Sequence, residues 1–253
     1  ILFLPLFIAG IYIAYQNKML KDDLRVSSVI QQIDAQPGTK THFFLPDSTE
    51  VWLNSASTIV FPSVFSGTTR TVELNGEAYF KVYKNKRKPF IVKNGDFAVE
   101  AVGTAFNLCA YSDDNKFLAT LEEGKIKVSV ETAQKSFLIE PGQQVRFLVS
   151  QKKLYKWDVN VSEVVAWKDG LLVFNQTPFS DVVRSLSRWF NADIQLADES
   201  IANYRYTATF TNENLYQVLE LLKLTAPIDY SLDKRLITSG NNFTKERIQI
   251  RKN

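Results

Sequence analysis

Cysteine, histidine and long apolar runs are scarce in this sequence. One cysteine, Cys109, and one histidine, His42, occur among 253 residues. A single cysteine excludes an internal disulfide, although it leaves the cellular compartment open. Because there is no cluster of Cys and His, we expect no zinc site, and nothing in the sequence indicates another metal or a cofactor.

The excess of positive charge is also small. The formal net charge is +3, and Lys and Arg are interspersed with Asp and Glu along the chain. Domains that bind nucleic acid carry concentrated basic patches, so we expect no direct contact with nucleic acid. Apolar residues make up 45% and charged residues 23% of the chain, as in ordinary globular proteins. The length is sufficient for two domains with separate cores.

The uncharged segment at the start, residues 1–15, is shorter than a complete membrane span. A transmembrane helix needs about 20 apolar residues. We therefore interpret residues 1–17 as the remaining part of a transmembrane helix that begins before Ile1, followed by a polar juxtamembrane connector over residues 18–38. A cleaved signal peptide is the alternative, but no basic residue precedes the apolar run and no small-residue cleavage motif follows it.

Charges after this segment give a weak indication of membrane orientation. Lys18, Lys21 and Arg25 favour a cytoplasmic location for the residues that follow, because basic residues are enriched on the cytoplasmic side. Asp22 and Asp23 dilute that bias. The residues alone leave the orientation open.

Residues 39–158 are predicted to be almost entirely β-structure. Alternating runs such as 97–102, 125–130 and 144–149 place apolar side chains on one face of a strand. Turn residues separate such runs at short intervals: Pro46-Asp47, Asn75-Gly76, Asn94-Gly95, Asp113-Asp114-Asn115, Glu123-Gly124 and Pro141-Gly142. Many short antiparallel strands at this spacing are typical of a sandwich or a stack of hairpins.

The stretch over residues 171–232 is interpreted as an internal duplication. A shift of 36 residues superimposes similar residues in the two halves: Phe174 on Phe210, Phe179 on Leu215, Val182 on Val218, Val183 on Leu219, Leu186 on Leu222, Asp193 on Asp229 and Leu196 on Leu232. Each copy predicts a strand, a helix and a strand, with the apolar faces of the two helices covering one sheet. A chance match is the alternative.

Residues 159–253 are accordingly predicted to form a second domain, a small duplicated β-α-β module, which makes the whole chain α+β. Thr177 is the expected N-cap of its first helix, with Pro178 at the first helical position. The second helix is expected to end before Pro227. A final strand over residues 247–250 is expected to join the sheet beside the last strand of the repeat.

Several motifs follow one another between residues 40 and 250. They are LPDSTEVWLN (45–54), LNGEAYFKV (74–82), VGTAFN (102–107), LEEG (121–124), AWKDGLLVF (166–174) and RWF (188–190). Together they resemble the FecR family of sigma-factor regulators, in particular its Bacteroidetes branch. One departure is Ser48, which stands where the family usually has glycine in a Pro-Asp-Gly turn.

The resemblance implies an anti-sigma regulator that crosses the inner membrane once. A cytoplasmic segment preceding residue 1 would hold an extracytoplasmic-function (ECF) sigma factor. The residues after the membrane helix would lie in the periplasm and sense an outer-membrane TonB-dependent transporter, an orientation that outranks the weak charge bias. The C-terminal module is similar in plan to the secretin/TonB short N-terminal signalling domain of such transporters, so like modules are expected to dock through a sheet edge or a helix face.

Gly103 and Thr104 are the one position at which the resemblance implies chemistry. Some FecR-like regulators cleave themselves at a Gly-Thr bond, where the threonine hydroxyl attacks the preceding carbonyl carbon and water opens the resulting ester. The alternative is a glycine bulge followed by an ordinary β-branched strand residue. We adopt this alternative as the expectation, and we expect no other enzymatic site.

The candidate partner contacts are tyrosines of the second domain. Tyr216 is preferred, because it lies between the core positions 215 and 218 of a predicted helix and is therefore expected to point outward. Tyr204 and Tyr206 are further candidates for an exposed aromatic patch. Burial under the sheet is the alternative for both.

The remaining ionisable candidates are interpreted as structural. His42 has no partner at the spacing of a catalytic triad and is expected at a strand surface. Cys109 is expected to be a small core residue. The carboxylate pairs at 113–114 and 122–123 adjoin turns, so we expect solvated turn charges.

A second class of function is compatible with the residues alone, a membrane-anchored periplasmic module that binds glycan or peptidoglycan. Exposed aromatic side chains on β-rich domains often line sugar-binding sites. Trp52, Trp157 and Trp167 are the candidates. A change of their fluorescence on titration with glycans would favour this alternative.

Overall fold

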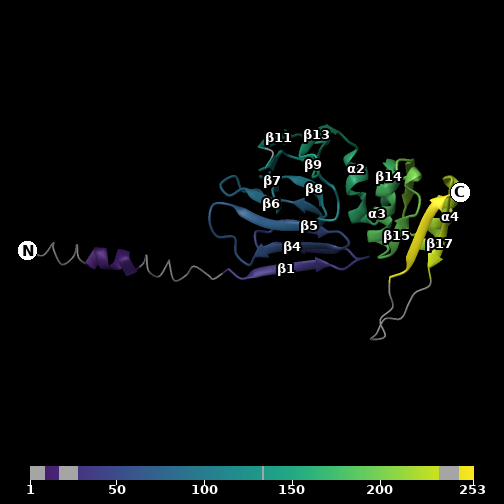
Figure 1. The fold of residues 1–253 in the computed structure, drawn as a ribbon. Coiled ribbons are helices and arrows are strands. Elements are labelled where there is room, and N and C mark those ends of the chain that lie inside the picture. Colours follow the sequence, from purple (N-terminus) through teal and green to yellow (C-terminus); the bar gives the residue numbers. More distant parts are fainter. Residues whose placement is uncertain (1–8, 17–27, 133, 234–244) are drawn as a thin grey trace, which may run out of the picture.

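The computed structural model describes residues 9–16, 28–132, 134–233 and 245–253. Figure 1 shows two domains side by side, with the described residues 9–16 on the side of the first domain opposite the second. Residues 9–16 are helical and exposed, and the other residues of the predicted span lie outside the described residues. Among the described residues, no helix is long and apolar enough to cross a membrane.

The first domain is a 13-stranded sheet folded around one long strand. Its strands are β1 (Ile30–Ala35), β2 (Thr41–Phe44), β3 (Glu50–Leu53), β4 (Ser57–Pro62), β5 (Arg70–Lys81), β6 (Phe90–Asn94), β7 (Phe97–Ala101), β8 (Ala105–Ala110), β9 (Lys116–Glu123), β10 (Ile126–Val130), β11 (Lys135–Ile139), β12 (Gln143–Leu148) and β13 (Lys153–Asp158). Strand β5 pairs with β4 and β6 along its first half and with β3 and β8 along its second half. The sheet is thus nearly closed on itself, and the expectation of many short strands is confirmed.

Strand β5 can change its pairing partners halfway along because it bends at Gly76, whose φ is 124°. A Cβ at this position would lie 2.6 Å from the Cα of Ser57, so only glycine allows the β4 backbone to approach so closely. On either side of the bend, apolar residues alternate into the core. Phe80 stacks on Phe106 there, with ring centroids 5.1 Å apart.

The connector expected over residues 18–38 contains a strand. Strand β1 pairs with β4 from Ile30 opposite Pro62 to Ala35 opposite Ser57. The sequence pattern is weak because the strand lies at a sheet edge with most of its side chains exposed. Ala35 is buried, which ties the strand to the core. The first domain therefore begins earlier than residue 39.

The second domain has the predicted element order but a different sheet arrangement. Its elements are α2 (Val161–Val165), η1 (Ala166–Asp169), β14 (Leu172–Pro178), α3 (Phe179–Trp189), β15 (Asp193–Leu196), η2 (Glu199–Ile201), β16 (Arg205–Phe210), α4 (Leu215–Thr225), β17 (Ile228–Asp233) and β18 (Arg247–Lys252). One sheet was expected, but β14 pairs with β16 while β15, β18 and β17 form a second sheet. Both sheets and both helices share one apolar core. The duplication itself stays a hypothesis.

The boundaries of the helices correct one prediction and confirm another. Helix α3 begins at Phe179, with Pro178 as its N-cap, because Thr177 and Pro178 still pair with β16. The Phe179 N–H instead donates to the Tyr204 carbonyl at 2.8 Å. Helix α4 ends at Thr225, before the proline, as predicted. Strand β18 lies beside β17, also as predicted.

Candidate interdomain site

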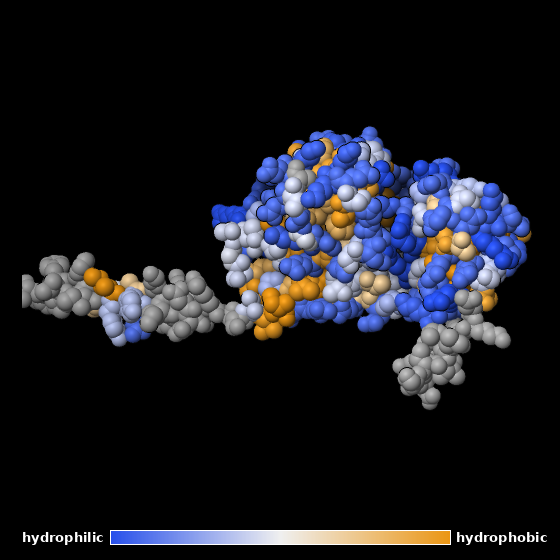
Figure 2. All heavy atoms as spheres, in the orientation of Figure 1, coloured by the Kyte–Doolittle hydropathy of each residue, from blue (hydrophilic) through white to orange (hydrophobic). Residues whose placement is uncertain are grey.

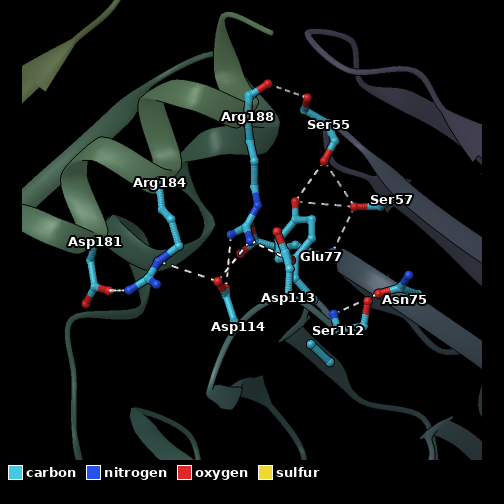
Figure 3. Close-up of polar contacts among 12 residues, drawn as sticks. Ser55, Ser57, Asn75, Glu77, Ser112, Asp113, Asp114, Asp181, Arg184 and Arg188 are labelled. Atoms are coloured by element: carbon cyan, nitrogen blue, oxygen red, sulfur yellow. Dashed lines mark hydrogen bonds and ion pairs between the residues drawn. The ribbon is translucent and has the colours of Figure 1, made fainter. Parts of the chain in front are cut away.

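The two domains are joined by a polar cluster centred on Arg188, near the C-terminal end of α3 (Figure 3). Its Nη1 lies 3.0 Å from Asp114 Oδ2 and its Nη2 lies 2.9 Å from Asp114 Oδ1. Nη2 also donates to Asp113 at 2.9 Å. A bidentate pair of this kind fixes both distance and orientation. Helix α3 is therefore held against the turn between β8 and β9.

Two further contacts surround the same arginine. Its guanidinium carbon lies 3.7 Å from the ring centroid of Tyr111, which is a close cation–π contact. Its backbone carbonyl accepts a hydrogen bond from the Ser55 hydroxyl at 2.6 Å. Burial opposes the charge, but the bonds to Asp114 outweigh it and raise the pKa of Arg188 above its ordinary value. Arg188 thus stays charged at every physiological pH.

A second ion-pair group lies one to two turns earlier in α3. Asp181 pairs with Lys116 of β9 and, at 2.7 Å, with Arg184. Arg184 also approaches Asp114, with Nε 3.5 Å from Oδ1. Burial alone would raise the pKa of Asp181, but its bonds to the two cations overcome that effect and lower it. Together with the Arg188 cluster, this group clamps α3 to the first domain, and we call the two groups the latch.

Behind the latch lies a cavity of about 250 Å³, whose polar lining includes Glu77. The two carboxylate oxygens of Glu77 accept hydrogen bonds from Asn54 and Asn107, each at 2.8 Å. Asn107 in turn accepts from the Trp167 indole at 3.1 Å, which connects β8 to the second domain. Burial raises the pKa of Glu77, and the two asparagine bonds only partly offset it.

An aromatic contact completes the interface beside the cavity. Trp167 and Tyr79 are both buried there, with Trp52 and Trp189 packed against them. Lys40 donates to the Trp167 carbonyl at 3.0 Å and lies 5.2 Å from the Trp189 ring centroid. The interface therefore combines a small apolar cluster with the charged latch, as interfaces between movable domains commonly do.

Helical periodicity explains why α3 can serve the core and the latch at once. Asp181, Arg184 and Arg188 follow one another at spacings of three and four, so they share a face. Val182, Val183 and Leu186 are buried on the opposite side. The polar stripe was visible in the sequence, but only the fold supplies Asp114 as its partner. Sequence reasoning missed this site and placed the carboxylates of 113–114 in solvent, whereas Asp114 is buried.

No group of three or more potential metal ligands occurs among the described residues. Cys109 borders the cavity, and burial raises the pKa of its thiol well above the ordinary value, which disfavours a thiolate nucleophile. The ion pairs and hydrogen bonds of the interdomain site instead hold the two domains together.

Gly103 and Thr104 lie away from the latch, in the loop between β7 and β8 and not within a strand as expected. Gly103 has a φ of 66°, and an added Cβ would lie 2.7 Å from side-chain carbons of Lys84. Thr104 is 4% exposed, and among the described residues its Oγ1 has no hydrogen-bond partner. The expectation of an uncleaved chain stays a prediction.

The three candidate tyrosines differ in their surroundings. Tyr216 is 45% exposed, and its hydroxyl donates to Glu246. Tyr204 is half-buried. Tyr206 is buried, and its hydroxyl lies 3.0 Å from Thr225 Oγ1, so this residue is a core residue and not a contact. Only Tyr216 offers a substantial surface to a partner.

The other predicted residues have structural neighbours. His42 is exposed on β2 as expected, stacks on Trp52 with centroids 4.4 Å apart and pairs with Glu50 at 2.9 Å, a partner not foreseen. Glu122 is exposed and accepts from Tyr79. Trp167 is buried in the interface, which removes it as a sugar-stacking platform. Trp157 is half-buried beside Arg146, at 5.0 Å.

Both domains and their arrangement have counterparts among solved structures. Two crystal structures of a candidate anti-sigma factor from Parabacteroides distasonis, at 1.65 and 2.50 Å resolution, are similar to this chain with TM-scores of 0.79 and 0.77. Sequence identity is 28% in both comparisons. The similarity covers 88% and 89% of this chain and 99% and 100% of those chains. The fold is thus that of a two-domain sigma-factor regulator.

Comparison of the sequence with known protein families gives the same assignment for both domains. Residues 31–127 match the family described as FecR protein, and residues 171–239 match FecR, C-terminal. No curated protein matches significantly. The chain belongs to the FecR family of anti-sigma regulators.

Proposed function

We propose that this chain relays the ligand state of an outer-membrane TonB-dependent transporter to a cytoplasmic ECF sigma factor. The observation that carries the proposal is the presence of both FecR regions in one chain, within a fold similar over 88% of its length to a candidate anti-sigma factor. The plan of the second domain, similar to that of transporter signalling domains, supports a transporter as the upstream partner.

The proposed location is the inner membrane, with a single span and the two domains in the periplasm. Support comes from the uncharged residues 1–15 and from the order of the elements, since the first domain comes before the second in the chain. The second domain is then farthest from the inner membrane along the chain. That placement suits a domain that contacts an outer-membrane protein.

In the proposed relay, the transporter binds the second domain and the latch passes the event to the first. Tyr216 is the proposed centre of the contact, since exposed tyrosines often anchor protein interfaces. A partner shifts the arrangement of the domains only if it binds one arrangement better than another. An interface made largely of ion pairs around a cavity offers such alternatives, because its contacts can be exchanged for water.

Affinity capture tests the proposed partner. The full chain serves as bait for detergent-solubilised outer membranes of the source organism, and bound proteins are identified by mass spectrometry. We expect enrichment of a TonB-dependent transporter. Tyr216→Asp should abolish that enrichment, because it places a charge in the centre of the contact.

Tyr155→Asp is the matched control, because Tyr155 has a similar exposure, 40%, but lies on β13 of the first domain. Loss of capture with both variants would indicate general damage and contradict a contact at Tyr216. Failure of the unchanged chain to capture any transporter would overturn the proposed partner. Retention of glycan fragments instead would favour the sugar-binding alternative.

A further inference from the structure

Exposed apolar side chains gather on the first domain at the end where β1 begins (Figure 2). The exposed fractions are 65% for Val29, 65% for Ile30, 62% for Phe44, 43% for Val64 and 57% for Tyr83. These residues come from four separate segments of the chain. Isolated exposed apolar residues are ordinary, but a shared location marks an interaction surface.

The same end carries a run of basic residues in and beside the loop between β5 and β6. The run comprises Lys81, Lys84, Lys86, Arg87 and Lys88. No Asp or Glu occurs within residues 81–95, nor within residues 51–72, which include the neighbouring loop between β4 and β5. Among the residues that the structure describes, none of the five cations forms an ion pair, although the protein contains many such pairs elsewhere.

A buried arginine holds these loops together. Arg70, 2% exposed, donates from Nη1 to Asp47 at 2.5 Å and to the Tyr83 carbonyl at 2.9 Å, and from Nε to the Lys88 carbonyl at 2.9 Å. The loop between β2 and β3 is thereby tied to the basic loop. Arg70 itself is neutralised by Asp47, so it organises this surface without adding to its charge.

The adjoining loops are tied in as well. Lys88 donates to the Phe65 carbonyl, which connects the basic loop to the β4–β5 loop. Val29 and Ser63 exchange hydrogen bonds of 2.8 and 3.1 Å, which fixes the start of β1 to the same place. We call this surface, residues 29–30, 44, 63–65 and 81–88, the loop end of the first domain.

The loop end lies opposite the latch. Both ends of β5 reach it, since Arg70 and Tyr83 are in contact, whereas the bend of β5 at Gly76 adjoins Ser57 and the interdomain cavity. Residues 9–16, where Ile11, Tyr12 and Ile13 are exposed, precede this end in the sequence.

We propose that the loop end docks on a membrane surface that contains anionic phospholipids. Aliphatic and tyrosine side chains enter the boundary between headgroups and acyl chains, and basic side chains around them pair with lipid phosphates. A nucleic acid would pair with the cations but would leave the exposed aliphatic side chains in water, whereas a lipid surface offers both phosphates and an apolar phase. The inference goes beyond sigma regulation, because it concerns only lipid and this surface.

Hydrogen–deuterium exchange of the full chain tests the proposal. The chain is mixed with vesicles of phosphatidylcholine alone or with vesicles that also contain phosphatidylglycerol. We expect the anionic vesicles to slow exchange of amides in residues 63–69 and 82–89, and added salt to reverse the effect. Each basic residue at such a surface strengthens binding about fivefold. The triple change Lys84→Glu, Lys86→Glu and Arg87→Glu removes three positive charges and adds three negative ones, so it should weaken binding by at least about a hundredfold.

The matched control reverses three exposed lysines elsewhere, Lys135, Lys152 and Lys153, and should leave the protection unchanged. Protection that is equal with the two kinds of vesicle, or that survives both salt and the triple change, would overturn the proposal. Equal protection by polyglutamate, which offers anions without an apolar phase, would assign the loop end to an acidic partner instead. Transporter capture is read out separately in detergent, so the two ideas can fail independently.

Discussion

Two buried threonine hydroxyls of the first domain have opposite surroundings. Thr104 Oγ1 has no partner among the described residues, whereas Thr120 Oγ1 accepts a hydrogen bond from Gln144 at 2.6 Å. A buried hydroxyl without a partner has lost water and gained nothing in exchange. The two residues therefore form a matched pair for the same isosteric substitution.

Thr104→Val is expected to leave the free energy of unfolding unchanged or to raise it by up to about 1 kcal/mol. Thr120→Val is expected to lower it by about 1–3 kcal/mol, because it leaves the buried Gln144 amide unsatisfied. Urea denaturation measures both values. A larger loss for Thr104→Val than for Thr120→Val would show that the Thr104 hydroxyl does have a partner.

The same variants report on self-cleavage. We expect mass spectrometry to find the unchanged chain intact. A fragment that begins at Thr104 and disappears in Thr104→Val would instead establish the hydroxyl as a nucleophile.

At the scale of elements, the latch depends on α3 and the β8–β9 turn, which come from different domains. Side chains of Arg188 and Asp114 are 17% and 6% exposed, so removing one partner leaves the other partly buried and unpaired. The environment of the pair therefore predicts strong coupling, in contrast to ion pairs in solvent.

Arg188→Gln and Asp114→Asn are each expected to lower stability by about 1–3 kcal/mol, and the double variant to lower it by less than their sum. Urea denaturation followed by tryptophan fluorescence gives the values, since Trp167 and Trp189 lie at the interface. The control is the solvated pair Lys168–Asp169, with the aspartate side chain 65% exposed, for which coupling below about 1 kcal/mol is expected. Additive losses for Arg188 and Asp114 would contradict the latch.

At the scale of the whole molecule, two carboxylates give the interdomain contact a dependence on pH in separate ranges. The pKa of Asp181 is lowered below its ordinary 3.8, so its contribution is complete above that value and is lost as pH falls through its folded-state pKa. The contribution of Glu77 depends on pH in the opposite direction. Its pKa is raised above 4.5, so the fold favours the protonated form and is penalised as pH rises from 4.5 through the folded-state value.

We therefore expect the two domains to separate as the pH falls through the folded-state pKa of Asp181, which lies below 3.8, because its contacts with Lys116 and Arg184 are then lost. Small-angle scattering would record the separation as an increase in the radius of gyration. Asp181→Asn should show a weaker response to acid, because it lacks the titrating group. A radius that stays constant to pH values where Asp181 is protonated would argue that the latch does not control the arrangement.

The sequence by itself determined most of the elements. Alternation of apolar residues predicted the short strands of the first domain, and the 3.6-residue period together with Pro227 predicted α3 and α4. These features depend on neighbours within a few residues, so local physics suffices for them. The motifs also indicated the FecR family, and the two family matches confirm this assignment.

Pairing between distant segments was decided only by the tertiary structure. Strand β18 inserts between β15 and β17, and β14 pairs with β16, which divides the expected single sheet in two. Asp114 looked like a solvated turn residue because its partner, Arg188, is far away in sequence. Likewise, the loop end brings together side chains from four segments, and Arg70 ties the β2–β3 loop to the basic loop there. Local patterns define which face of an element is apolar, but the burial of a charge depends on what packs against it, and that is a property of the folded chain.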